Sequence, residues 1–549
     1  MKKPLFLIIL VLCTAFLVYS VATTSVSWIE PTDFGLVSKL PLIYYAGLVL
    51  LGCVWYIGIK NQNYLPAALI LTISYLYIAP TLIRDPVWIS NSYYPYGESL
   101  LISQNGHLIP NPQATMVSYR YWPLFLYFSS GFTTLTGFSP EVILKFFPLF
   151  TISMYALLTF LILKIKLASP FALVGSALVL ASLFIRQQYF GPQSIAYIFF
   201  LATLLVTLLL FFDKKANKRT LAVILVALFV ITTITHPLTS FMSIAIFLSL
   251  YLVVRFTDKK SPFKLNKLLV GSLIIWLAYN SYAAAPFFDT AIRHFYELFT
   301  GSRGLTIATE SSRVFGSTPM LVNFVASWAI VGLMGFVAVI SIIKIVRKRK
   351  QMKGSDLTFS AFNILLLIFF TVFAFGGEYG AVEAYQRAFM FGLIPLSFLV
   401  ITLLSSKPKI LIAFLAVLIV LNIPAQYGAD NFRLATPSQL AGSAFIANYA
   451  PQNITLVGEF TLYIRYYDPL KSYQVLEVGL SSPFNRVPNS TVLSQELNNA
   501  DYVIVSDIQH NLFMFYIGRD PMEDVNLTNM NVIYNNGAYS LLQNINSTR

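Results

Sequence analysis

Charged residues are scarce in this sequence. Only 11% of its 549 residues are Asp, Glu, Lys or Arg, whereas a soluble domain carries about 25%. Hydrophobic residues make up 57% of the chain and occur in long blocks separated by short basic clusters. A block of about 20 apolar residues crosses a bilayer as a helix, and these blocks lack the alternation typical of strands. The sequence therefore predicts an α-helical polytopic membrane protein.

Several chemical signatures are also missing. The two cysteines, Cys13 and Cys53, lie in separate hydrophobic blocks, so neither a disulfide framework nor a cysteine metal site is indicated. The sequence contains no Walker A loop, dinucleotide-binding glycine motif, HExxH or G-x-S-x-G. These absences disfavour ATP-driven transport and soluble-type hydrolysis. Charges inside the hydrophobic blocks are nearly absent as well, which disfavours ion-coupled transport.

The net charge of +14 comes from Lys and Arg clustered between the hydrophobic blocks. That distribution is typical of cytoplasmic loops rather than of a nucleic-acid-binding surface. We predict about 13 spans, over residues 5–21, 42–59, 64–83, 142–163, 170–185, 192–212, 220–235, 238–255, 268–286, 321–346, 358–376, 388–404 and 409–424. A cleaved signal peptide is the alternative for the first of them.

The segment 121–137 is apolar enough to suggest a further span, but charge counting argues against one. If it does not cross, every later basic cluster falls on the cytoplasmic side, as expected for short loops. If it crosses, all of those clusters lie outside. We therefore predict that this segment lies at the outer interface, with Trp122 among its anchors.

The composition becomes polar at about Gln426. We predict a transmembrane domain over 1–425, with an outer loop 84–141 carrying interfacial helices, and a small extracytoplasmic α/β domain over 426–549. In that domain residues 455–460 and 502–507 resemble strands, and 436–450 a helix with Thr436 as N-cap. The predicted location is an archaeal plasma membrane, with the N-terminus cytoplasmic and the C-terminal domain extracellular. Asn-x-Ser/Thr sequons in that domain agree with this side.

The first cluster of polar candidates lies in the large outer loop and consists of Arg84, Asp85, Glu98, His107 and Arg120. Asp85 is expected at the outer end of a span. A carboxylate there can act as a general base on an acceptor hydroxyl, or hold a divalent cation against a phosphate leaving group. The alternatives are that Asp85 pairs with Arg84 or caps a turn. Glu98 is the second candidate catalytic carboxylate, and His107 is interpreted as a surface residue.

A second cluster, Glu378, Glu383 and Arg387, precedes or opens a late span. Arg387 can grip a lipid phosphate through two hydrogen bonds, or serve as a snorkelling anchor. His236 precedes Pro237 at the tip of an outer hairpin, where a structural role is the alternative to substrate binding. The charged loop 287–320 is a possible cover for the site.

The outer-loop pattern resembles the GT-C class of membrane glycosyltransferases. The residues that carry the resemblance are Asp85, the Tyr-rich stretch 93–108, the segment 119–137 with its Tyr-Trp-Pro, and Arg387 with Pro395. The resemblance implies an oligosaccharyltransferase- or mannosyltransferase-like architecture with about 13 spans and an outer domain.

It also implies transfer of a sugar from a polyprenyl-phosphate donor in the membrane to a glycan or protein acceptor on the extracytoplasmic face. Asp85 would be the base or the ligand of Mg²⁺ or Mn²⁺, and Arg387 would bind the donor phosphate. The expected further substrate contacts are His236, Arg84, Arg120 and Tyr94.

Two other functions remain open. The protein can be a non-catalytic GT-C-like scaffold of a cell-surface assembly system, which Asn91 favours, because counting back from Gly106 it occupies the position where the class usually has an acid. It can also be a transporter of a lipid-linked glycan, which would move its substrate across the bilayer without changing it covalently.

Overall fold

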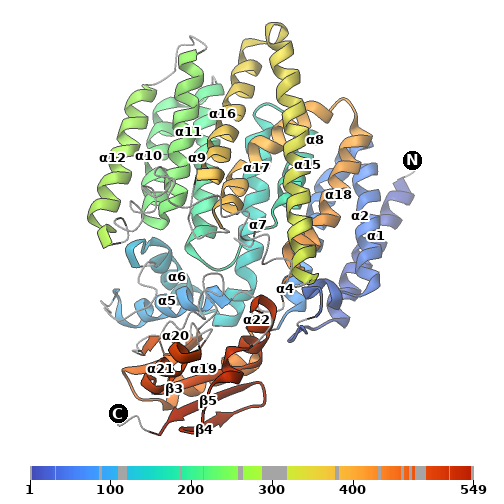
Figure 1. Cartoon of the computed structure of the whole chain (residues 1–549). Coiled ribbons are helices and arrows are strands. Elements are labelled where there is room, and N and C mark those ends of the chain that lie inside the picture. Colours follow the sequence, from blue (N-terminus) through green and yellow to red (C-terminus); the bar gives the residue numbers. More distant parts are fainter. Residues whose placement is uncertain are drawn as a thin grey trace.

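The computed structural model describes most of the chain, namely residues 3–30, 32–85, 90–108, 120–185, 188–213, 215–256, 264–286, 288, 318–376, 383–430, 435–458, 463–468, 471, 473–475, 490–517 and 520–545. A bundle of long helices carries a small sheet with its own helices at one end (Figure 1). We call this the sheet end of the bundle. We call the opposite end the basic end, because lysines and arginines gather at the helix ends there. Among them are Lys60, Lys164, Arg255, Lys267, Arg347 and Lys409.

The predicted spans form helices. They are α1 (Lys3–Thr23), α2 (Leu42–Lys60), α3 (Leu65–Ile73) continued by α4 (Ala79–Ile83), α7 (Pro140–Lys164), α8 (Ser169–Ser182), α9 (Pro192–Phe212), α10 (Lys218–Thr235), α11 (Pro237–Phe256), α12 (Leu265–Tyr282), α15 (Thr318–Lys348), α16 (Gly354–Gly376), α17 (Glu383–Leu404) and α18 (Pro408–Tyr427). Among the described residues, 11 spans are long and apolar enough to cross a membrane. The other two predicted spans correspond to α8 and α12.

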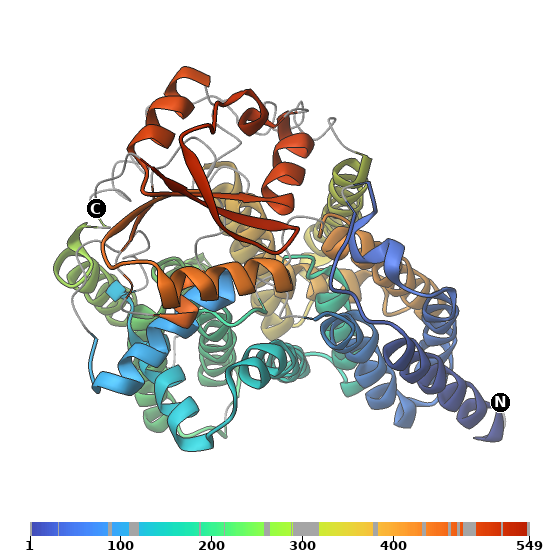
Figure 2. The same cartoon turned by 90° about the horizontal axis from the view of Figure 1, so that it is seen from below.

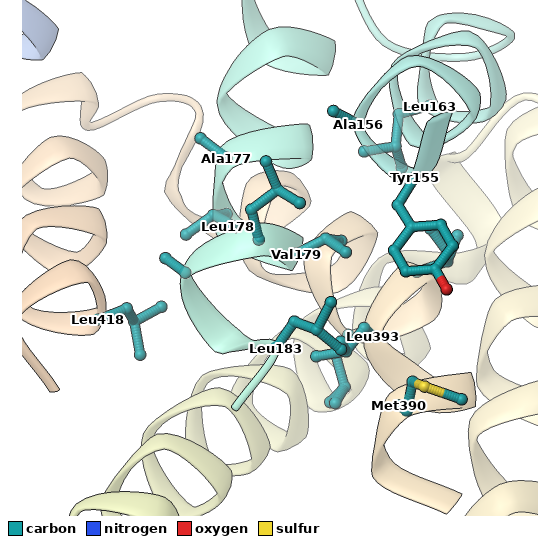
Figure 3. Close-up of a cluster of buried hydrophobic side chains, with 14 of the residues drawn as sticks. Tyr155, Ala156, Leu163, Ala177, Leu178, Val179, Leu183, Met390, Leu393 and Leu418 are labelled. Atoms are coloured by element: carbon teal, nitrogen blue, oxygen red, sulfur yellow. The ribbon is translucent and has the colours of Figure 1, made fainter. Parts of the chain in front are cut away.

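Helix α8 has only 14 residues, or about 21 Å at 1.5 Å per residue, less than the roughly 30 Å of a hydrocarbon core. Its burial explains why a short helix suffices, because every residue from Val174 to Ser182 is shielded by neighbouring helices. Figure 3 shows part of this core, where side chains of α7, α8, α17 and α18 meet, among them Tyr155, Leu178, Met390 and Leu418. Helix α8 therefore lies in the tightly packed centre of the bundle.

Two shorter helices lie between the bundle and the sheet, α5 (Tyr93–Asn105) and α6 (Leu124–Thr136) (Figure 1). Helix α5 ends at Gly106 in the left-handed conformation, with φ of 75°, which glycine adopts without a steric penalty. Helix α6 has 13 residues, too few to cross a bilayer. Its length agrees with the prediction that the segment 121–137 does not span.

The C-terminal region folds as a five-stranded sheet in the order β2-β1-β3-β5-β4. Strand β1 is parallel to β2 and β3, and β5 is antiparallel to β3 and β4. The strands are β1 (Ile454–Val457), β2 (Tyr473–Val475), β3 (Tyr502–Ser506), β4 (Met530–Asn535) and β5 (Tyr539–Asn544). The helices are α19 (Pro437–Tyr449), α20 (Ile464–Tyr467), α21 (Ser490–Asn499) and α22 (Asp507–Ile517).

Side-chain alternation explains the layers of this region, because successive residues of a strand face opposite sides of the sheet. In β3, Ile504 packs with α19 and α20 on one side, and Val503 packs with α21 and α22 on the other. The predicted capping box of α19 is present, with reciprocal hydrogen bonds between Thr436 and Gln439. The predicted architecture, a bundle of membrane-spanning helices with a small C-terminal α/β domain, is confirmed. Seen from the sheet end, the sheet covers part of the bundle and leaves α1 at the periphery (Figure 2).

Candidate functional site

The predicted site residues lie in three groups at the sheet end, each combining residues far apart in sequence. The first group centres on Glu98 in α5, the second on Arg84 after α4, and the third on Arg387 in α17. His107 lies apart from these groups as an exposed residue near Asn105.

Glu98 is buried between two arginines. Only 1% of Glu98 is exposed. Arg120 Nε and Nη2 donate to its two carboxylate oxygens at 3.0 Å each, and Nη2 approaches Oε2 at 2.8 Å. Arg465 Nη1 of α20 donates to Oε1 at 3.3 Å. A carboxylate removed from water needs such charged partners to remain ionised, so the three side chains form a buried ion cluster that joins the outer loop to the C-terminal domain.

The contact around this cluster is close and aromatic. A Cβ atom at Gly97 would lie inside van der Waals contact with the backbone carbonyl of Arg465, so only glycine lets α20 approach α5 this closely. The Arg465 guanidinium also lies 5.9 Å from the Tyr94 ring centroid, a cation–π distance. Tyr93 meets the rings of Tyr463 and Tyr466 edge to face. The C-terminal domain thus completes the surroundings of Glu98 and Tyr94.

We expect Gly97→Ala to separate α5 from α20 and to lower the stability of the protein by about 1–3 kcal/mol, the usual cost of overpacking. Gly131→Ala in the adjacent helix α6 is the matched control, because nothing lies near its added methyl group. That control should leave the unfolding temperature unchanged or raise it. Thermal unfolding of both variants in detergent measures the difference, and equal temperatures would contradict the close contact.

Arg84 is anchored just beyond the C-terminal end of α18. It pairs with Asp430, and both side chains are fully buried. The Arg84 guanidinium lies 4.8 Å from the Tyr427 ring centroid. Burial lowers the pKa of Arg84, and the Asp430 carboxylate acts in the opposite direction. The adjacent Asp85 does not pair with Arg84, one of the alternatives for it, because the Arg84 side chain points inward to Asp430.

Asp85 itself is exposed, and its backbone N–H donates to the Val26 carbonyl at 3.2 Å. Within the described ranges its carboxylate has neither a hydrogen-bond nor an ion-pair partner. An exposed carboxylate at this end of the bundle is available to a substrate or a cation. In the part of the chain that the structure describes, no group of three His, Cys, Asp or Glu residues is arranged to hold a metal ion. Metal binding by Asp85 therefore stays a prediction.

His236 and Arg387 are electrostatic neighbours. His236 lies in the turn between α10 and α11, where its Nδ1 accepts the backbone N–H of Thr239 at 3.3 Å and lies 3.0 Å from the Thr239 hydroxyl. This is the position and the bond of an N-cap, so His236 has the structural role that the sequence left open. Desolvation, together with the charge of Arg387, lowers the pKa of His236 to about 3. The ring is thus neutral near pH 7 and, with Nδ1 accepting, carries its proton on Nε2.

This pKa predicts a pH dependence of stability. His236 takes up a proton in the unfolded chain near pH 6.5 but in the folded protein only near pH 3. Its contribution is therefore complete above pH 6.5 and is lost as the pH falls toward 3, by at most about 1.4 kcal/mol per pH unit. We expect His236→Asn, which keeps a capping acceptor, to lose less unfolding temperature between pH 7.5 and 5 than the wild type. Equal losses would contradict the buried neutral imidazole.

Sequence reasoning missed Asp430, Tyr427 and Arg465. A charged residue just after a span could have flagged Asp430, but no signal in the sequence links Arg465 to Glu98. The Glu378 candidate and the charged loop 287–320 lie outside the described residues, apart from residues 288 and 318–320 at its ends. The Glu383 side chain is also outside them.

Comparison with known proteins places this geometry on a known fold. No protein-family profile matches the chain, and no curated protein matches its sequence. Among solved structures, the Archaeoglobus fulgidus oligosaccharyltransferase in complex with zinc and sulfate is similar, with a TM-score of 0.50 and 14% identity over 84% of this chain and 70% of that one.

The Cupriavidus metallidurans ArnT also matches. Bound to undecaprenyl phosphate it gives a TM-score of 0.47 and 11% identity, covering 92% of this chain and 98% of that one. In the apo state the values are 0.38 and 11%, with 83% and 94% covered. The spanning helices make the chain a multi-pass membrane protein. The match to the oligosaccharyltransferase shows the fold of the GT-C glycosyltransferases, so the predicted resemblance is confirmed at the level of the fold.

Proposed function

We propose that the protein is an integral membrane glycosyltransferase. It takes a sugar from a polyprenyl-phosphate donor and transfers it to a glycan or protein acceptor at the sheet end. The observation that carries this proposal is that Arg387 and His236 are electrostatic neighbours in a chain with the GT-C fold. The basic end would face the cytoplasm, as the positive-inside rule expects, and the C-terminal domain would then lie outside the cell.

Arg387 would bind the donor phosphate. It lies near the N-terminus of α17, where the helix dipole also favours an anion. The neutral His236 would offer its Nε2–H as a hydrogen-bond donor without adding a charge. Arginine forms two parallel hydrogen bonds to phosphate, so Arg387 would fix the headgroup while the polyprenyl tail stays in the membrane.

Asp85 would act on the acceptor. In the transfer step the acceptor oxygen attacks the anomeric carbon, the bond from that carbon to the phosphate oxygen breaks, and polyprenyl phosphate leaves. Asp85 would take the proton of the acceptor hydroxyl as a general base, or hold Mg²⁺ or Mn²⁺ against the leaving phosphate. Its exposure supports access by either partner.

Glu98, predicted as a second catalytic carboxylate, has a geometry that supports another role. Both of its oxygens accept hydrogen bonds from arginines, and the side chain is 1% exposed, which supports a structural role over contact with a substrate hydroxyl. We propose that Glu98 and Arg120 hold the Tyr-rich helix α5 against the C-terminal domain. Tyr94, predicted as a substrate contact, is 1% exposed and lies beside the Arg465 guanidinium, which supports the same packing role.

Lipid binding tests the proposal. We expect purified wild-type protein to bind undecaprenyl phosphate and Arg387→Ala to bind it at least about tenfold more weakly, since a charged hydrogen-bonded contact is worth about 1.5–3 kcal/mol. Arg255→Ala at the basic end is the matched control and should bind as the wild type does. Titrations with and without Mg²⁺ and Mn²⁺ measure both, and an equal effect of the two variants would contradict a specific phosphate site at Arg387.

A further inference from the structure

Arg84 and Asp85 are consecutive residues with opposite surroundings. Arg84 is 1% exposed and Asp85 lies on the surface. The backbone at Arg84 is extended, with φ of −87° and ψ of 139°, and it runs parallel to Val26. Val26 N–H donates to the Ile83 carbonyl at 2.9 Å, and Asp85 N–H to the Val26 carbonyl. In extended backbone successive side chains point to opposite sides, so an Arg84 fixed inside turns Asp85 outward.

A π-helical turn precedes this segment. Residues Ser74–Ile78 join α3 to α4 with the wider i→i+5 hydrogen bonding of a π-helix. One inserted residue rotates everything after it by about 100° about the helix axis. The π-helical turn therefore determines toward which side of the bundle the Arg84 side chain points.

Tyrosines from two other helices hold the π-helical turn. Tyr44 of α2 donates its hydroxyl to the Tyr75 carbonyl at 2.5 Å, and Tyr427 of α18 donates to the Leu76 carbonyl at 2.5 Å. Both tyrosines are fully buried. Tyr427 thus acts twice, through its hydroxyl on the turn and through its ring face on Arg84.

The connection between α1 and α2 contacts both the backbone at Arg84 and the end of α18. It carries Val26, which pairs with Arg84, and Gly35, whose φ is 53°. A Cβ atom at Gly35 would overlap the Tyr427 carbonyl and approach the Asp430 backbone. The residues on both sides of Arg84 are therefore held by the α1–α2 connection, which itself packs against the segment that leads from α18 into the C-terminal domain.

We propose that Asp430 and Tyr427 are positioning residues, which anchor Arg84 inside the bundle and thereby aim the Asp85 carboxylate at the substrate. Asp85 is the group that acts, and this inference rests on the proposed function for its consequence in catalysis. The anchor itself is a property of the fold. Through this anchor, the direction of the Asp85 side chain depends on the segment that follows α18, where the C-terminal domain begins.

Chemical labelling of position 85 tests the anchor without any activity. In a full-length background with Cys13→Ser and Cys53→Ser, Asp85→Cys provides a single thiol, and its rate of reaction with a charged methanethiosulfonate is measured in detergent. We expect Asp430→Asn to lower this rate at least fivefold. Without the Asp430 carboxylate a buried Arg84 is costly, so the segment turns Arg84 to water and position 85 inward.

The matched control is Asp33→Asn, which removes the surface partner of Lys39, at 2.7 Å, in the same connection that carries Val26. It should leave the labelling rate unchanged. Tyr427→Phe removes only the hydroxyl and should lower the rate in the same direction by a smaller factor, which keeps the test valid if Asp430→Asn does not fold. An unchanged rate in folded Asp430→Asn, or in Tyr427→Phe where that variant alone folds, would overturn the proposal.

The transfer reaction separates this inference from the proposed function. With Asp85 in place, we expect Asp430→Asn to reduce kcat while the KM for the lipid donor stays near that of the wild type, because Arg387 is untouched. Arg84→Lys, which keeps the buried charge, should recover more kcat than Arg84→Met. If labelling responds to Asp430 but Asp85→Asn transfers sugar normally, the anchor stands and the catalytic role of Asp85 fails.

Discussion

Replacement of Asp85 by asparagine should abolish sugar transfer while leaving the protein folded. The side chain is exposed and keeps its size in Asp85→Asn, so stability should change by less than about 0.5 kcal/mol. Loss of a general base lowers a rate by about 10²–10⁴-fold, and loss of a cation ligand would act in the same direction. The measurement is the initial rate of transfer from a polyprenyl-phosphate hexose at saturating donor.

The matched control is Asp356→Asn, an exposed carboxylate at the basic end that pairs with Lys166 at 3.0 Å. It should transfer sugar at the wild-type rate. Addition of Mg²⁺ or Mn²⁺ to metal-depleted wild type separates the two roles of Asp85, because only a cation ligand makes the rate depend on the metal. Full activity of Asp85→Asn would exclude both roles.

The second large effect is expected at the buried ion cluster. Glu98→Gln should destabilise the protein by about 3–5 kcal/mol, since it leaves the buried Arg120 and Arg465 without their carboxylate partner. The cluster joins α5 and Arg120 to the C-terminal domain through three buried side chains. Thermal unfolding in detergent, followed together with protease sensitivity of the C-terminal domain, measures the effect.

Glu141→Gln is the control for this prediction. The Tyr466 hydroxyl donates to Glu141 at 2.9 Å across the same pair of regions, but on the surface. Exposed contacts of this type contribute about 0–1 kcal/mol, so this variant should unfold near the wild-type temperature. If Glu98→Gln and Glu141→Gln unfold at the same temperature, the cluster does not hold the two regions together.

The sequence was sufficient for the course of the chain through the bundle. Hydrophobic length located the spans, and the positions of basic residues identified 121–137 as a segment that does not cross, which the 13 residues of α6 agree with. Local capping chemistry located α19 through Thr436 and Gln439. These features depend on neighbours in sequence, where single-residue preferences act directly.

The partners of the site residues could not be predicted in the same way. Glu98 meets Arg465 across 367 positions, and Arg84 meets Asp430 across 346. Such pairs depend on how the sheet region docks on the bundle, and a single sequence contains no measure of that. The inward turn of Arg84 also depends on the π-helical turn at Ser74–Ile78, whose apolar residues look like ordinary helix.

The most direct test of the account is the fate of a radiolabelled sugar on a polyprenyl phosphate. Purified wild-type protein in liposomes, supplied with membrane extract of its native host as the acceptor source, is incubated with a panel of polyprenyl-phosphate hexoses. The account predicts that one donor loses its label to an acceptor and releases an equal amount of polyprenyl phosphate, and that Asp85→Asn does neither. If wild-type protein leaves every donor covalently unchanged although Arg387 is needed for lipid binding, the protein is a scaffold or a transporter and not a glycosyltransferase.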